Sequence, residues 1–81
     1  MDKELQKIYK FAFRHALNGS STAQMVVIEQ IEKVMEEMGT AHLVDMIADI
    51  EHAVKHELLD GCAKEMWMEF AEELKQEVNK R

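Results

Sequence analysis

Five side chains that can bind a metal ion or carry a proton recur at helical spacing in the middle of the chain. Successive members are separated by three, four, three and four residues, and they are His42, Asp45, Asp49, His52 and His56. In an α-helix this spacing places all five on one side. This side is therefore a metal or proton site, a protein interface or a hydrated surface.

The metal interpretation depends on one pair of residues. His52 and His56 form an H-x₃-H pair, which can hold one ion from a single helix. The residues between them lack the glutamate of H-E-x-x-H, so no general base is placed beside such an ion. Asp49 and His52 give one carboxylate-x-x-His motif, whereas carboxylate di-iron bundles need two such motifs and two further carboxylates. We favour a hydrated face and keep a protein interface and a metal site as alternatives.

Three glycines divide the chain into four segments with helical periodicity. The chain has 81 residues and no proline, and glycine occurs only at positions 19, 39 and 61. A chain of this length forms one domain. Apolar residues recur every three or four positions in each segment, which is typical of amphipathic helices. The sequence therefore predicts an all-α single domain, 1–81. We expect a compact bundle of four short helices over about 3–17, 22–38, 41–59 and 61–79.

The same spacing predicts which residues each helix buries. The first helix is expected to bury Leu5, Ile8, Tyr9, Ala12, Phe13, Ala16 and Leu17. The second is expected to bury Val27, Ile28, Ile31, Val34, Met35 and Met38. The third is expected to bury Leu43, Met46, Ile47, Ile50, Val54 and Leu58. The fourth is expected to bury Ala63, Met66, Trp67, Phe70, Leu74 and Val78.

Polar residues predict where the last three helices begin. Ser21 is expected to cap the second helix, with Gln24 in the capping-box position. Thr40 is expected to cap the third, directly after Gly39 ends the second. The apolar faces of the third and fourth helices differ by roughly 100° or more, so one straight helix cannot present both to one core. We therefore expect a break at Asp60, with Asp60 as the cap of the fourth helix.

Ionised side chains form two further surfaces. A basic row on the first helix comprises Lys3, Lys7, Lys10 and Arg14, and the aromatic Phe11 is expected to lie exposed beside it. An acidic strip on the fourth helix comprises Glu65, Glu69, Glu72, Glu73 and Glu77, and a shorter strip on the second comprises Glu29, Glu32 and Glu36. Like charges four residues apart destabilise a helix by a few tenths of a kcal/mol per pair. Hydration explains both surfaces without a function, and the alternative is that each binds a partner of opposite charge.

Composition excludes several classes of function. The net charge is −6, and residues 18–79 hold fourteen acidic side chains against four lysines, which argues against direct nucleic-acid binding. No segment approaches the ~20 apolar residues of a membrane span. Cys62 is the only cysteine and is expected to be a small buried residue, so no disulfide forms within the chain. The charged start of the chain has no signal-peptide pattern, and we expect a cytoplasmic protein.

These features predict binding rather than catalysis. There is no phosphate-binding loop, paired-cysteine motif or nucleophile elbow, so we expect neither an enzyme nor a cofactor. We expect a small acidic protein-binding module, an inhibitor or adaptor. It is comparable with such proteins of phages and mobile elements in size and charge alone. A homodimer is also expected, because so short a chain forms a marginal core and Phe11 lies outside the main apolar arc. The alternative function is a metal-binding protein that uses the His/Asp face.

Overall fold

Four helices make up most of the chain in the computed structural model. It describes residues 2–19 and 21–81, with side chains for all of these except residues 21 and 22. The helices are α1 (Lys3–Leu17), α2 (Ser21–Val34), α3 (Thr40–Lys55) and α4 (Gly61–Asn79), and a 3₁₀ turn, η1 (Met35–Glu37), follows α2. No strand forms within the described ranges. The predicted all-α bundle of four short helices is confirmed.

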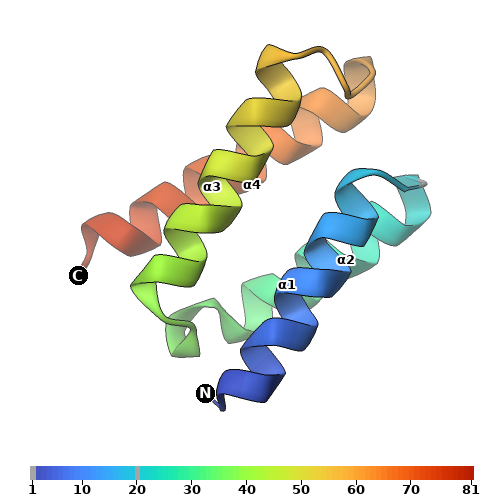
Figure 1. The fold of residues 1–81 in the computed structure, drawn as a ribbon. Helices are drawn as coiled ribbons and strands as arrows, with labels where there is room; N and C mark the ends of the chain where they lie inside the picture. The colour runs from blue at the N-terminus through green and yellow to red at the C-terminus, as the bar shows by residue number, and fades with distance from the viewer. Residues whose placement is uncertain (1, 20) are drawn as a thin grey trace.

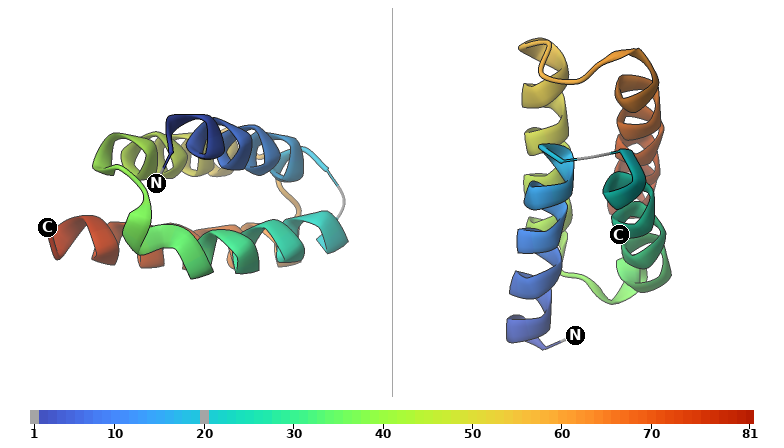
Figure 2. Two further views of the ribbon diagram at one scale, coloured as in Figure 1. Left: turned by 90° about the horizontal axis from the view of Figure 1, so that it is seen from below. Right: turned by 90° about the vertical axis from the view of Figure 1, so that its right-hand side faces the viewer.

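The helices pack in two layers (Figures 1 and 2). α1 and α3 lie side by side in one layer, and α2 and α4 form the other. α1 and α2 are antiparallel, as are α3 and α4, so α1 runs parallel to α3. The segment from η1 to the start of α3 crosses between the layers. The bundle therefore has four seams, by which we mean the lines where neighbouring helices meet: α1/α2, α1/α3, α2/α4 and α3/α4.

Aromatic side chains from α1 and α4 occupy the centre of the core. Phe13 and Trp67 are fully buried and pack edge to face, with ring centroids 5.4 Å apart, and Phe70 lies 6.0 Å from Trp67. Edge-to-face aromatic pairs stabilise a core beyond the area they bury. The other core residues are Ala16, Leu17, Ile28, Ile31, Met35, Met38, Leu43, Met46, Ile50, Ala53, Ala71 and Leu74. The predicted inner faces of α2, α3 and α4 are thus largely confirmed.

Four predicted burials are wrong. Leu5 and Ile8 on α1 are 42% and 62% exposed, because α1 buries only a narrow stripe centred on Phe13. Leu58 is 61% exposed because α3 ends before it. Cys62 is also exposed, in the first turn of α4.

The corner between α2 and α3 is longer than the sequence predicts. α2 ends at Val34 rather than at residue 38, and η1 and an extended Met38 follow it. Gly39, not Thr40, is the N-cap of α3, and it contributes no capping side chain. The side chain of Gln6 on α1 instead reaches the corner, where its Oε1 accepts a hydrogen bond of 2.9 Å from the Gly39 N–H. The expected Ser21 cap lies outside the described side chains.

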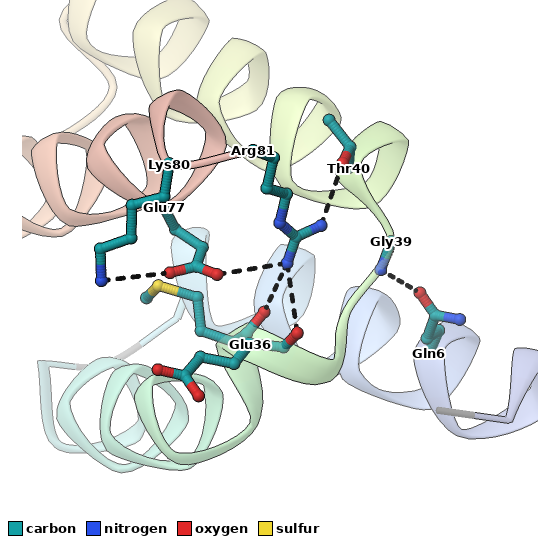
Figure 3. A network of polar contacts seen from close by, with 8 residues as sticks. Gln6, Glu36, Gly39, Thr40, Glu77, Lys80 and Arg81 are labelled. Carbon is teal, nitrogen blue, oxygen red and sulfur yellow. Dashed lines mark hydrogen bonds and ion pairs between the residues drawn. The ribbon is translucent and has the colours of Figure 1, made fainter.

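Arg81 joins the ends of three helical elements at this corner (Figure 3). Its Nη1 donates to Thr40 Oγ1 at 3.0 Å, and its Nη2 donates to the Met35 and Glu36 carbonyls at 3.3 and 3.4 Å. Nη2 also lies 3.4 Å from Glu77 Oε1, and the Glu77 side chain is only 11% exposed. Glu77 is therefore a buried partner of Arg81 and not part of an exposed strip. The guanidinium supplies further donors to two carbonyls of η1, where the helical hydrogen-bond pattern ends.

α3 ends with a residue in an unfavourable backbone conformation. It stops at Lys55, four residues before the predicted end, and Glu57 has a positive φ of 55°. The Leu58 N–H bonds to the Ala53 carbonyl at 3.0 Å, and the Glu57 N–H bonds to the Val54 carbonyl at 3.2 Å. This is a Schellman ending, in which glycine is preferred at the left-handed position. As predicted, Asp60 then caps α4, accepting a hydrogen bond from the Ala63 N–H at 3.4 Å.

The substitution Glu57→Gly is expected to stabilise the fold. A non-glycine residue in the left-handed region costs about 1–2 kcal/mol, and glycine removes this strain. Part of the stabilisation is offset, because glycine has greater conformational freedom in the unfolded chain. We expect the free energy of unfolding to rise by about 0.5–1 kcal/mol, measured by urea denaturation. Glu57→Ala is the control, because alanine removes the charge but keeps the strain. Equal effects of the two substitutions would contradict a conformational cause.

Candidate protein-binding surface

The basic row of α1 and the His/Asp face of α3 meet along the α1/α3 seam. Lys10 Nζ lies 2.7 Å from Asp45 Oδ2, and Arg14 Nε lies 3.3 Å from Asp49 Oδ2. In both pairs the partners are 35 residues apart, because α1 and α3 run parallel with a constant offset. The hydrogen bond from Lys10, followed by its charge, holds the pKa of Asp45 below its ordinary value of 3.8. Two surfaces that the sequence suggested separately are therefore partners of each other.

The remaining members of the His/Asp face do not converge on one point. The rings of His52 and His56 lie close together, with centroids 4.3 Å apart, and both residues are exposed. His42 lies near the other end of α3, where its Nδ1 is buried without a hydrogen-bond partner among the described residues. The described part of the chain contains no group of three or more His, Cys, Asp or Glu side chains that could hold an ion. Among the described residues the metal interpretation thus has two ligands, His52 and His56, fewer than zinc sites in proteins use.

The rest of the basic row faces outward. Lys3 and Lys7 are exposed, and neither has an ion-pair partner in the described ranges. Phe11 is 75% exposed, and its ring is stacked on that of His15 with centroids 6.4 Å apart. The exposure of Phe11 agrees with the sequence prediction. A partner could contact these groups, but Lys10 and Arg14 are already engaged within the chain.

The α3/α4 seam is closed by opposite charges. A groove of about 240 Å³ runs along it, with Ile50, Val54, Met68 and Ala71 among its lining. Lys75 bridges this groove, since its Nζ lies 3.6 Å from Glu51 Oε2 and 3.7 Å from Glu72 Oε1. Like the α1/α3 seam, this one is neutralised locally.

The α2/α4 seam, in contrast, brings like charges together. The Glu73 carboxyl of the acidic strip faces the Glu32 carboxyl of α2, and a hydrogen bond between two carboxyl groups needs a proton on one of them. This hydrogen bond, followed by burial and by the charges of Glu32 and Glu69, raises the pKa of Glu73 to about 7. Within the described residues no cation lies at ion-pair distance from Glu32, Glu65, Glu69 or Glu73. The spacing of the glutamates predicted an acidic strip on each of these helices. It did not predict that Glu32 and Glu73 would face each other.

We call this surface the acidic face and define it by Glu32 of α2 with Glu65, Glu69 and Glu73 of α4. Its carboxylates are accessible, and they repel one another in the free protein. It can hold a proton near neutral pH, and it can bind positive charge.

The raised pKa of Glu73 predicts that stability falls as pH rises. Its carboxyl binds a proton more tightly in the folded chain, with a pKa of about 7, than in the unfolded chain, where the ordinary value is 4.5. The stabilisation is fully present below the unfolded pKa and is lost as pH rises through the folded pKa. Glu73→Gln imitates the protonated carboxyl. At about pH 8 it should raise the free energy of unfolding by about 1 kcal/mol, much less than the full shift, because solvent screens an exposed pair.

Urea denaturation at about pH 5 and about pH 8, followed by the fluorescence of buried Trp67, measures this effect. Glu65→Gln on the same helix is the matched control, because it removes the same charge outside the pair. If Glu73→Gln and Glu65→Gln changed the pH dependence equally, general repulsion and not the Glu32–Glu73 pair would be its cause.

Comparisons with known proteins give no relative: no family model, no curated protein and no solved structure matches the chain. Among the described residues no helix is long and apolar enough to cross a membrane.

Proposed function

We propose that the chain is a non-enzymatic protein-binding module whose acidic face docks on a basic surface of another protein. The feature that supports this most is the Glu32–Glu73 pair, where two carboxyl groups meet on an exposed seam and the pKa of Glu73 is raised to about 7. Natural proteins retain destabilising arrangements where function requires them. A basic partner would remove the repulsion, and the free energy released would contribute to binding.

The contrast between seams supports the same surface. The α1/α3 and α3/α4 seams place cations beside their carboxylates, through Lys10, Arg14 and Lys75. Among the residues that the structure describes, Glu32, Glu69 and Glu73 of the acidic face have no cation at ion-pair distance. Complementary charge steers association and selects partners, so this surface fits a partner rich in lysine and arginine. Such a module would act by occupying the partner's basic surface, as an inhibitor, or by linking it to a second protein, as an adaptor.

Two further properties belong to the proposal. We place the protein in the cytoplasm, because an exposed free thiol such as that of Cys62 suits a reducing compartment. We also propose that it self-associates as a homodimer, since a domain of this size gains stability from a second copy.

A decalysine peptide is a suitable probe of the acidic face. The triple variant Glu32→Gln, Glu69→Gln, Glu73→Gln is compared with Glu4→Gln, Glu37→Gln, Glu57→Gln, which removes the same charge elsewhere. By isothermal titration calorimetry, we expect at least about tenfold weaker binding for the first variant and about twofold or less for the second. Equal weakening would show that only net charge matters. The same pair of variants can then be used in affinity capture of the natural partner.

A further inference from the structure

The α1/α2 seam differs from the other three because it is apolar. Between α1 and α2 lies a groove of about 140 Å³, lined by Ile8, Tyr9, Ala12, Val26, Val27 and Gln30. None of these side chains is ionised. Ile8 is 62% exposed and Val26 is 54% exposed at its edges. A contiguous apolar face of this kind marks an interaction surface more often than scattered apolar residues do.

Two opposite charges lie at one end of this face. Glu4 belongs to the first turn of α1 and Lys33 to the last turn of α2. Because the two helices are antiparallel, both residues lie at the end of the bundle where α1 begins (Figure 1). Neither is in an ion pair with another described residue.

We propose that a second copy of the chain binds this face, with a two-fold axis parallel to the helices. This symmetry places α1 of each copy against α2 of the other in antiparallel orientation. Ile8 of one copy then lies opposite Val26 of its partner, because both residues border one groove at the same height. Glu4 of each copy lies opposite Lys33 of the other, so these opposite charges complement each other. The assignment rests on the proposed self-association and names its surface.

Charge favours a second copy as the occupant. Two chains of net charge −6 repel each other at the acidic face, but the α1/α2 face brings together apolar groups and one pair of opposite charges per side. The area agrees with a weak dimer. Helices of about 15 residues and ~10 Å diameter give a flat footprint of roughly 450 Å² per copy. Together the two footprints reach about 900 Å². Stable interfaces bury at least about 1,200 Å² of accessible surface, so the expected interface is smaller than that of a stable dimer. We therefore expect dissociation in the micromolar range.

Sedimentation equilibrium on the full chain tests the interface. The wild type is expected to form a dimer, and Ile8→Lys or Val26→Lys should each raise its dissociation constant at least about tenfold. Val44→Lys is the matched control, because Val44 is a 48% exposed valine on α3 and should have no effect. Glu4→Lys and Lys33→Glu should each weaken the dimer, and the double exchange should restore it. Circular dichroism verifies that each variant is folded.

Each contrary outcome overturns a different statement. A 9.4 kDa monomer at all concentrations would overturn the self-association itself, and the surface with it. A dimer that persists when Ile8→Lys and Val26→Lys are combined would leave self-association standing and overturn the surface. Weakening by Val44→Lys alone would place the interface on α3. Failure of the charge exchange to restore the dimer would overturn the two-fold arrangement.

Discussion

Replacing Arg81 with alanine is expected to lower the free energy of unfolding by about 2–3 kcal/mol. The substitution removes hydrogen bonds to Thr40 and to the Met35 and Glu36 carbonyls of η1. It also leaves Glu77, whose side chain is only 11% exposed, without its closest cation. Hydrogen bonds to charged groups contribute about 1.5–3 kcal/mol, and an uncompensated buried charge costs more than an exposed one.

Lys80→Ala is the control for this prediction. Lys80 is adjacent in sequence and also approaches Glu77, with its Nζ 3.8 Å from Oε2, but its side chain is 71% exposed. Exposed ion pairs contribute about 0–1 kcal/mol, so the loss should stay below about 0.5 kcal/mol. Urea denaturation followed by Trp67 fluorescence gives both values. Equal losses for Arg81→Ala and Lys80→Ala would show that the corner network (Figure 3) does not stabilise the fold beyond its net charge.

The second large effect is expected for Gln6→Leu, with a loss of about 1–2 kcal/mol. Gln6 is 8% exposed and accepts the hydrogen bond from the Gly39 N–H at the start of α3. Leucine has a similar volume but no acceptor, and a part-buried N–H without a partner costs about 1–3 kcal/mol. Gln6→Glu keeps an acceptor beside a helix N-terminus, which favours negative charge. It should therefore lose less stability than Gln6→Leu, and the reverse order in urea denaturation would contradict this role of Gln6.

Periodicity within each helix predicts much of the fold. The spacing of Ile31, Leu43 and Leu74 and the capping position of Asp60 depend on local rules, and the structure confirms them. Predictions of burial are wrong where the burial of a side chain depends on which other helix lies beside it. Ile8 has the spacing of a core residue but lies beside an open seam, while Gln6 is buried because Gly39 needs an acceptor. A helical wheel does not show which other helix lies against a given side.

The candidate surface was predicted only in part for the same reason. The acidic strip was evident from the spacing of its glutamates, and its exposed members were identified correctly. The pairing of Glu73 with Glu32, and of Lys10 with Asp45, follows from the order of helices in the two layers. The order of the helices in the two layers depends on where the segment around η1 crosses between them. The spacing of residues within a helix does not predict this crossing. The basic row therefore looked like a free surface in the sequence, although half of it is neutralised by α3.

The division of the surface into differently charged seams links stability to the proposed function. Opposite charges close two seams, an apolar groove lies at the third, and repulsion remains at the acidic face. A partner with positive charge would make the fourth seam resemble the neutralised ones. The proton shared by Glu32 and Glu73 would then be released, because a nearby cation favours the ionised carboxylate. Binding should consequently strengthen as pH rises through the pKa of Glu73, which is about 7.

Proton release on binding tests this function most directly. Calorimetric titration of decalysine into the protein at about pH 7, in two buffers with different ionisation enthalpies, measures the number of protons released. Glu73 is about half protonated there, so the wild type should release about half a proton per molecule, and Glu73→Gln should release almost none. Binding without proton release in the wild type, or with equal release by Glu73→Gln, would contradict docking of a basic partner at the Glu32–Glu73 pair.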